Sequence, residues 1–438
     1  ATAKIGERTF KEFKKNFVVT KDTIFGALAF ETEKFDADLL LELWPEQIGS
    51  STRKWLSTRG NGGEFRNAKL QAFAKLPALN PTLLFSQSHS DEAHIAGISG
   101  SWGWHDLNFT WKEGSPSISS VDLEARIFEN QLSMEILKAK MPNLRLKNGQ
   151  VELYPVLGYG NLSLKRSVEI DVTIDGRVLA FRNLLDDPTV RKLPVEMKKI
   201  TNPSGNIITK ISTVSELQYK KLKLNSISAV ASLSDASFGN LPLDENFSAG
   251  NIELTLEEDG KILFNGTGKI SGVESSFSGQ QTVDKNLNMV VKTVASEYLS
   301  QKIKDFTGVD IYGDSAMRLH LNYSPDDKSG KGSITVDLTD TAIDLPIFNW
   351  AKIPGEIGKM EASFYFSSSS LTKIEIEDAI IGTLQGKGVF EIFDDLSTSK
   401  ASVTNFKFPG YDIDRMTIIT NKDKSMKVIA EGGLIDTT

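Results

Sequence analysis

The chain contains no cysteine and only four histidines among its 438 residues. The absence of cysteine excludes disulfides, thiolate nucleophiles and cysteine-ligated zinc sites. Four histidines are too few for a multi-histidine metal centre unless most of them converge. The only two close in sequence, His89 and His94, differ in spacing from the i, i+4 pair of a zinc-binding helix. We therefore expect no metal site and no cofactor.

Long apolar runs and concentrated charge are also missing. No stretch of about 18 apolar residues is present, so the sequence offers no candidate for a membrane-spanning helix. The 50 basic and 57 acidic residues give a net charge of −7, and no long run of one sign occurs. A surface that binds a phosphate backbone needs the opposite balance. We therefore expect no nucleic-acid partner.

The dominant pattern is an alternation of apolar residues with charged or hydroxyl-bearing ones. A period of two predicts strands with one apolar face and one polar face. Turn sequences such as KNG at 147–149 and EDG at 258–260 separate the alternating stretches, as in antiparallel hairpins. The clearest alternating stretches are 121–127, 170–174, 252–256, 334–338 and 362–366. We predict an all-β fold with a few short helices, built on antiparallel sheet.

Three stretches interrupt this alternation and predict short helices near 45–59, 184–193 and 293–306. In the first, Trp55 and Leu56 share an apolar face. In the third, Val294, Tyr298, Ile303 and Phe306 recur at helical spacing. The chain returns to strand through glycine after each helix. We therefore expect one continuous segment, 1–438, of loosely repeated modules at 1–60, 61–203, 204–308 and 309–438.

Several short motifs superficially resemble catalytic or ligand-binding sites. The glycine-rich stretches 266–272 and 382–388 do not open a helix, so strand glycines explain them better than phosphate loops. The carboxylate pairs Glu375 with Glu377 and Asp394 with Asp395 fit polar strand faces and turns. The tryptophans at 102, 104 and 111 fit a core or edge role, although they could stack on sugar rings. We expect no enzymatic activity.

A set of short phrases, spread from about residue 40 to the end, carries a family resemblance. The phrases are LWP at 43–45, TRKWL at 52–56, GEFRNAKL at 63–70, PSGN at 203–206, SAVASLSDAS at 228–237, GNIEL at 250–254, GTGKISGV at 266–273, ITVDLTDTAIDLP at 334–346 and KIPGE at 352–356. In order and spacing they resemble the AsmA-like family, in its long YhdP-like branch of bridge-like lipid-transfer proteins.

The resemblance implies an elongated, twisted antiparallel β-sheet that forms an open groove in the periplasm of a Gram-negative cell. It implies a periplasmic segment that carries phospholipid, or another acyl-chain lipid, along a hydrophobic β-groove between inner and outer membrane in outer membrane biogenesis. Attachment to the inner membrane is expected through an anchor outside this segment.

The same resemblance gives the alternating residues a role. The candidates for lining the lipid groove are Val121, Leu123, Ile170, Val172, Ile174, Ile252, Leu254, Leu256, Ile334, Val336, Leu338, Phe364 and Phe366. The candidates for helices that cap the groove are Trp55, Leu56, Val294, Tyr298, Ile303 and Phe306. Alternation alone does not separate an open groove from a filled sandwich core. An extracytoplasmic interaction or adhesin-like protein with a filled core, and a carbohydrate-active β protein, therefore stay as alternatives.

Overall fold

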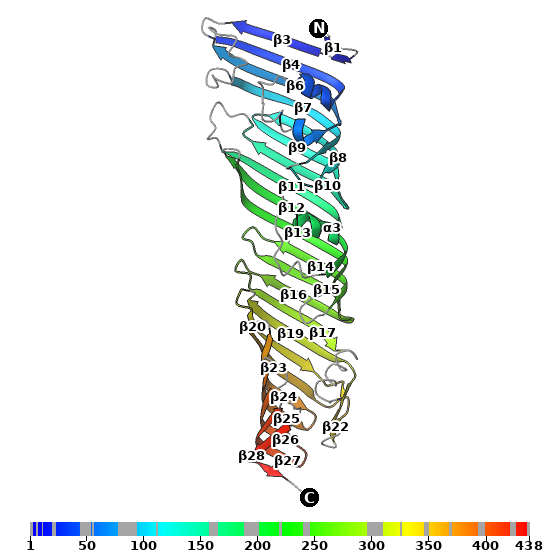
Figure 1. Ribbon diagram of the computed structural model, residues 1–438, viewed down its shortest axis with the longest axis vertical. Helices are drawn as coiled ribbons and strands as arrows, with labels where there is room; N and C mark the ends of the chain where they lie inside the picture. The colour runs from blue at the N-terminus through cyan, green and yellow to red at the C-terminus, as the bar shows by residue number, and fades with distance from the viewer. Residues whose placement is uncertain are drawn as a thin grey trace. The chain divides into compact units, whose positions relative to one another are not determined.

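The computed structural model consists of antiparallel β-strands with a few short helices, which confirms the predicted fold class (Figure 1). The structure describes residues 3–5, 8–10, 12–19, 23–43, 54, 57–77, 94–110, 113–156, 165–187, 201–218, 221–239, 246–295, 310–324, 326–345, 350–367, 370–392, 399–420 and 426–435. Contacts divide the chain into two compact units. Unit 1 comprises residues 1–233 and 256–258, and unit 2 comprises residues 234–255 and 259–438.

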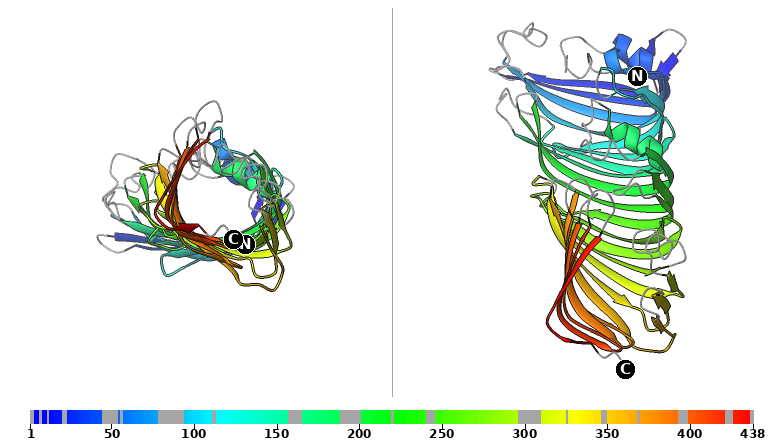
Figure 2. Two further views of the ribbon diagram at one scale, coloured as in Figure 1. Left: turned by 90° about the horizontal axis from the view of Figure 1, so that it is seen from below. Right: turned by 60° about the horizontal axis from the view of Figure 1, so that its bottom comes forward.

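Unit 1 is a curved antiparallel sheet in which most strands pair with their neighbours in the chain (Figure 2). Its strands are β1 (Ala3–Ile5), β2 (Arg8–Phe10), β3 (Glu12–Val19), β4 (Thr23–Asp36), β5 (Gly60–Asn61), β6 (Glu64–Pro77), β7 (His94–Phe109), β8 (Ile118–Phe128), β9 (Gln131–Met141), β10 (Leu144–Tyr154), β11 (Arg166–Arg177), β12 (Thr201–Gln218) and the first part of β13 (Lys221–Gly239). The order of pairing is β3, β4, β6, β7, β8, β9, β10, β11 and β12. The short β5 pairs with β7, and β1 pairs with β2.

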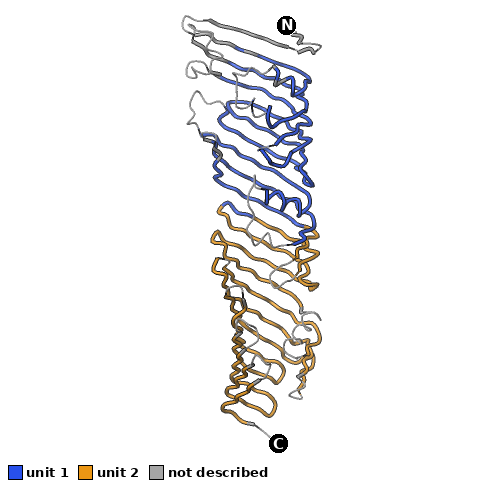
Figure 3. Tube along the Cα trace, viewed as in Figure 1, with its two compact units in different colours: residues 1–233, 256–258 blue, residues 234–255, 259–438 orange. Residues whose placement is uncertain are grey.

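Unit 2, orange in Figure 3, repeats the same architecture with a small additional sheet. Its strands are the end of β13, β14 (Phe247–Leu256), β15 (Ile262–Ile270), β16 (Val273–Gln281), β17 (Leu287–Ala295), β18 (Asp310–Tyr312), β19 (Ser315–Ser324), β20 (Ser329–Asp337), β21 (Ala342–Leu345), β22 (Trp350–Lys352), β23 (Gly358–Ser367), β24 (Ser370–Ile381), β25 (Leu384–Ile392), β26 (Ser399–Phe408), β27 (Tyr411–Thr420), β28 (Met426–Glu431) and β29 (Leu434–Ile435). The main sheet pairs in the order β15, β16, β17, β19, β20, β23, β24, β25, β26, β27 and β28. The additional sheet consists of β18, β21 and β22.

The helices differ from the prediction in position. Helix α1 (Ala37–Leu43) directly follows β4, upstream of the helix predicted at 45–59. Within that predicted range, Lys54 and residues 57–59 are helical, and most of the other positions lie outside the described residues. In the part of the chain that the structure describes, no helix has both the length and the apolar character needed to cross a membrane.

The prediction of a helix at 184–193 was wrong in its bounds. Helix α3 spans Val178–Leu185, and the chain turns at Asp186, while residues 188–193 lie outside the described residues. The helix shows the apolar spacing i, i+3, i+7 at Val178, Phe181 and Leu185. This spacing was overlooked because it follows directly on the alternation of β11. The module boundary predicted at 203 falls inside β12.

The third predicted helix, at 293–306, cannot begin at 293, because residues 293–295 belong to β17. Val294 pairs with Ala316 of β19 and is 45% exposed. The strand that contains Leu287, Met289 and Val291 continues through Val294 to Ala295. A β-branched residue such as Val294 favours this extended conformation. The remaining positions, 296–306, lie outside the described residues.

Close approach between strands explains two glycines in the middle of unit 2. A Cβ added at Gly279 would lie 2.4 Å from the carbonyl oxygen of Asn288 and 2.6 Å from the Phe264 ring. A Cβ added at Gly332 would lie 2.0 Å from the Phe364 ring. In both places an aromatic ring therefore lies on the backbone of the neighbouring strand, which keeps this face of the sheet thin.

We predict that Gly279→Ala lowers the free energy of unfolding by about 2 kcal/mol, because a methyl group has no room between the Asn288 backbone and the Phe264 ring. The matched control is Gly386→Ala in β25, where the nearest atom would lie at 3.5 Å. This control should be neutral. Chemical denaturation of both variants measures the difference, and equal stability of the two would contradict the proposed close approach.

Candidate functional site

Strand register places most of the apolar side chains of each sheet on one face, although a few, such as Ile208, Val214 and Val294, lie exposed on the other. Directly opposed residues in an antiparallel pair project to the same side, and residues i and i+2 along one strand do likewise. We call this side the apolar face of each unit, and the other side the polar face. A set of opposed residues followed from strand to strand is called a row.

Two rows of unit 2 contain only apolar residues or glycine over eleven consecutive paired strands, β15 to β28. The first row is Gly266, Phe277, Val291, Leu319, Ile334, Ala362, Ile376, Gly388, Val403, Met416 and Ala430. The second row is Phe264, Gly279, Met289, Leu321, Gly332, Phe364, Ile374, Phe390, Ala401, Ile418 and Val428. At about 4.8 Å per strand, each row extends for about 48 Å.

Most of the large side chains of these two rows are half-buried, and Val428 at the end of the second row is exposed. Leu319, Ile334, Phe364, Ile374 and Phe390 each keep part of their surface in contact with solvent. The core of an ordinary β-sandwich would bury such residues against a second sheet. Val291, Ala362 and Ala401 are buried, and all three are smaller than their neighbours in the rows. The rows therefore form an apolar surface that protein covers only in part.

Unit 1 has comparable rows, with a buried core at one end of its strands. One row is Phe35, Phe65, Trp104, Leu123, Ile136, Gly149, Val172 and Ile211. Another is Phe30, Leu70, Gly100, Ile127, Leu132, Leu153, Val168 and Ser215. Val172, Leu153 and Val168 are half-buried members of these rows that do not belong to this core.

Helix α1 covers the first strands of unit 1. Its Ala37 is buried in one cluster with Phe35, Phe65 and Trp104, and Leu39 packs against that cluster. The Phe65 ring stacks on Phe35 at 5.0 Å and contacts the Trp104 ring at 4.4 Å. Trp104 is thus a core residue, as the sequence predicted. Its Nε1 is buried without a hydrogen-bond partner, so this ring is not available for stacking on a sugar.

The small sheet of β18, β21 and β22 has the covering role in unit 2. Ile343 and Trp350 are buried in one cluster with Val336, Leu338 and Phe408. Lys352 fixes this cover, because its ammonium group donates to the carbonyl oxygens of Thr339 at 3.0 Å, Thr341 at 2.9 Å and Ile353 at 3.1 Å. The side chain of Lys352 is 1% exposed. Three acceptors satisfy all three donors of the buried ammonium.

The predicted groove-lining residues lie on the apolar faces in two different environments. Val121, Leu123, Ile174, Val336 and Leu338 are buried, and all of them except Ile174 belong to the covered clusters just described. The half-buried candidates are Ile170, Val172, Ile252, Leu254, Leu256, Ile334, Phe364 and Phe366. Ile252 lies beside Gly266, since a Cβ on Gly266 would lie 3.1 Å from its Cα, and so continues the first row into β14.

The predicted cap residues are largely unplaced. Val294 was wrongly predicted: it lies in a strand, on the polar face opposite Ala316. Trp55, Leu56, Tyr298, Ile303 and Phe306 lie outside the described residues. The covering elements seen here, α1 and the β21–β22 hairpin, were not selected from the sequence, although Leu39 and Leu43 with Asp38 in the first turn formed a readable helix signal.

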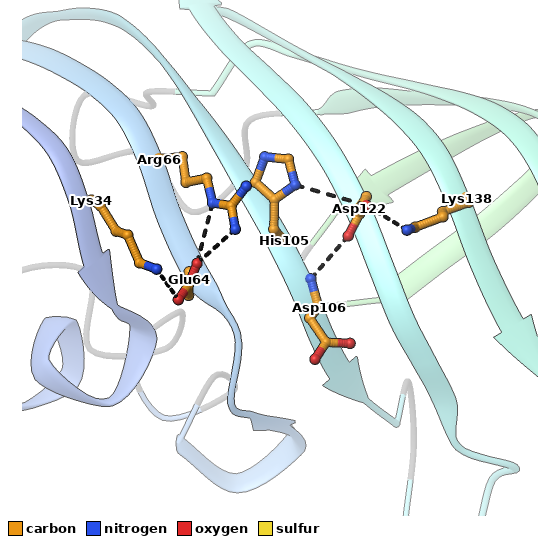
Figure 4. Close-up of polar contacts among 7 residues, drawn as sticks. All are labelled: Lys34, Glu64, Arg66, His105, Asp106, Asp122 and Lys138. Carbon is orange, nitrogen blue, oxygen red and sulfur yellow. Dashed lines mark hydrogen bonds and ion pairs between the residues drawn. The ribbon is translucent and has the colours of Figure 1, made fainter.

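Rows of ion pairs cross the polar face. Figure 4 shows two of them in unit 1, on strands β4 to β9. Glu64 accepts from Lys34 at 2.5 Å and from Arg66 at 2.8 Å. Asp122 accepts from Lys138 at 2.8 Å and from the backbone N–H of Asp106 at 3.0 Å, while His105 Nδ1 lies at 3.8 Å.

These contacts hold the carboxylates ionised. Hydrogen bonds from Lys34 and Arg66 lower the pKa of Glu64. Burial alone would raise the pKa of Asp122, but hydrogen bonds from Lys138 and the Asp106 amide outweigh it, so the pKa is lowered. In unit 2, Glu375 pairs with Lys373 and accepts from Tyr365 at 2.7 Å, which also lowers its pKa. A glycosidase needs one carboxyl group with a raised pKa as its general acid, and these groups are shifted in the opposite direction.

The remaining motifs have structural explanations. Gly266 and Gly268 lie within β15, and Gly386 and Gly388 lie within β25, while Gly272 and Gly382 lie in the adjoining turns, so neither glycine-rich stretch opens a helix. Asp394, Asp395 and Trp111 lie outside the described residues. Among the described residues, no three acidic or histidine side chains gather as metal ligands.

The sequence analysis did not name row members such as Leu319, Ile374 and Phe390 as groove-lining candidates. The alternation of Met317, Leu319 and Leu321 was a usable signal for them.

Comparison with family models, with curated proteins and with solved structures finds no match to this chain.

We predict that Asp175→Asn destabilises unit 1 in a pH-dependent way. Burial by itself would raise the pKa of Asp175, but hydrogen bonds from Lys147 at 3.0 Å and Arg145 at 3.1 Å lower it. A carboxyl group whose pKa is lowered on folding stabilises the fold above about pH 4, and this contribution is lost as the pH falls through its folded pKa. Because both cations are more than half exposed, the loss at pH 7 should be about 1 kcal/mol.

Denaturation of wild type and Asp175→Asn at a series of pH values measures this effect. The difference between them should shrink below pH 4. Glu124→Gln is the control, because Glu124 faces Glu135 across the sheet and its charge gains no such partner there. A difference that stays constant down to pH 2 would contradict the role assigned to Asp175.

Proposed function

We propose that the apolar faces bind the acyl chains of phospholipids, with the headgroups remaining in water. The observation that carries this proposal is the pair of uninterrupted apolar rows in unit 2, most of whose large side chains are half-buried. A monomeric protein rarely leaves so large a contiguous apolar surface without a partner. Phospholipid, or another acyl-chain lipid, is the partner that the family resemblance suggests.

Dimensions favour movement of the lipid along the rows rather than binding in one pocket. An acyl chain spans about half of the 30 Å hydrocarbon core of a bilayer, so a row of about 48 Å exceeds the length of one chain about threefold. Successive positions in a row are chemically similar, because each strand contributes an aliphatic residue, a methionine, a phenylalanine or a glycine. A lipid would therefore find nearly equal sites one strand apart.

Energetics support the same conclusion. Full burial of a methylene is worth about 0.8 kcal/mol, and a chain that lies on one face loses contact with water on about one side only. Ten methylenes then gain about 4 kcal/mol, which corresponds to a dissociation constant of about 1 mM. Contacts of this strength hold a lipid against the sheet and still allow it to leave each position.

The proposed setting follows the family resemblance. We place the chain in the periplasm, as a segment of an AsmA-like protein that carries phospholipid between inner and outer membrane. Its tether to the inner membrane would lie outside this segment. No nucleic acid, metal or cofactor, and no enzymatic step, enters this function.

The filled core of unit 1 favours the alternative of an interaction or adhesin-like protein for that part of the molecule. Beneath α1 the apolar face is filled by Phe35, Phe65 and Trp104, as in a protein with a packed core. If the whole apolar face were covered in this way, an interaction or adhesin-like role would follow. The half-buried rows of unit 2 are the reason for preferring lipid.

We predict that Ile334→Glu weakens binding of a phospholipid with a fluorescent acyl chain by at least tenfold, because it places a carboxylate in the middle of the first row. Thr335→Glu is the matched control. It puts the same charge on the next residue of β20, on the polar face between Arg318 and Glu361, and should leave binding unchanged.

Fluorescence titration of the full chain measures both affinities, and thermal unfolding checks that both variants fold. Equal affinity of wild type and Ile334→Glu would count against lipid binding on the apolar face. An equal loss in the two variants would show that the charge acts through stability.

A further inference from the structure

Arg166 is a cation on the apolar face of unit 1. It is the first residue of β11, it pairs with Leu217 of β12, and it lies two positions before Val168. Because residues i and i+2 of a strand share a face, its side chain projects to the side of Val168. This is the side that carries the apolar rows.

The position lies at the edge of the sheet away from the helices. Helices α1 and α3 follow β4 and β11, which run parallel to each other because six antiparallel pairings separate them. Both helices therefore lie at the edge where these strands end. Arg166 lies where β11 begins, at the opposite edge.

The guanidinium of Arg166 has no partner among the described residues. Its Nε is buried without a hydrogen-bond acceptor, and the side chain as a whole is half-buried. The neighbouring cation Lys165 projects to the other face, where it pairs with Glu216 at 3.3 Å. One cation of this adjacent pair is thus neutralised on the polar face, while the other lies on the apolar face, where Leu217, Val168 and the small hydroxyl residue Ser215 are its neighbours in the register.

A buried N–H without an acceptor is unfavourable, and a native structure usually satisfies it with water or a ligand. A guanidinium binds phosphate through parallel hydrogen bonds, and it does so better than an ammonium. Val168, Leu217 and Leu153 surround the position with half-buried apolar surface. The best-fitting ligand carries a phosphate at one end and hydrocarbon at the other.

We infer that Arg166 binds the phosphate of a phospholipid headgroup at this edge of unit 1, with the acyl chains on the adjoining rows. This inference rests on the proposed function and adds a headgroup contact to it. The apolar rows themselves do not distinguish one headgroup from another. Arg166 would make unit 1 prefer lipids that carry a phosphate over neutral lipids with the same chains.

The test compares two ligands with identical acyl chains, phosphatidylglycerol and diacylglycerol, on the full chain. Because the chain contains no cysteine, Thr213→Cys provides a single labelling point for an environment-sensitive fluorophore. Thr213 is half-buried and faces Ile170 on the apolar face. Its signal reports binding in unit 1.

In the labelled protein, phosphatidylglycerol should bind about tenfold more tightly than diacylglycerol. Arg166→Gln should abolish this preference without changing the affinity for diacylglycerol. Arg166→Lys should retain part of the preference for phosphatidylglycerol, because the positive charge remains but the planar guanidinium with its parallel hydrogen bonds is lost. Lys165→Gln, the adjacent cation of the polar face, should keep the full preference.

A preference that survives Arg166→Gln, or that disappears equally with Lys165→Gln, would overturn the assignment and leave the proposed function intact. Equal affinity of the protein with Arg166 intact for both lipids would also overturn the assignment, without contradicting the proposed function. Displacement of phosphatidylglycerol by millimolar inorganic phosphate would assign the site to free phosphate instead. Failure of both lipids to bind would refute the proposed function, and this inference with it.

Discussion

Cross-strand register is the constraint on which the rest of this structure depends. A period of two in each strand only separates two faces. The long apolar rows arise because consecutive strands are paired so that apolar residues meet apolar residues or glycine, as Leu319 meets Ile334 and Ile334 meets Ala362. A slip of one residue would send a whole strand's apolar side chains to the polar face. The ion pairs of Glu64, Asp122 and Asp175 on that face oppose such a slip.

Partial covering is what separates this sheet from a sandwich. Helix α1 in unit 1 and the β21–β22 hairpin in unit 2 each bury one end of the apolar face, and the ammonium of Lys352 holds the hairpin in place through three carbonyl oxygens. Beyond these covers, the rows keep half-buried aliphatic and phenylalanine side chains. Rings that lie on glycines, as Phe364 lies on Gly332, leave a thin and smooth surface. Such a surface suits a hydrocarbon chain that makes many weak and similar contacts.

The sequence predicted the fold class and the inward residues of individual strands, because alternation is a local property. Ile170, Val172 and Ile334 all lie on apolar faces as expected. It did not predict which strand residues end up covered, because that depends on where α1 and the β21–β22 hairpin pack. Val294 was misplaced because helical spacing and strand alternation coincide over a few residues. Arg166 was missed because the alternation was followed only from Ile170 onward, whereas the structure begins β11 at Arg166 and so puts this cation in phase with Val168 and Ile170.

Photo-crosslinking along one strand tests the central claim most directly. A photoreactive residue would be placed in turn at Arg318, Leu319, His320, Leu321 and Asn322 of β19, and the purified protein would be irradiated in the presence of phospholipid. The account predicts lipid adducts at Leu319 and Leu321, the two positions in the apolar rows, and none at the three positions between and beside them. Adducts of equal yield at all five positions, or at none, would contradict an apolar face that carries lipid.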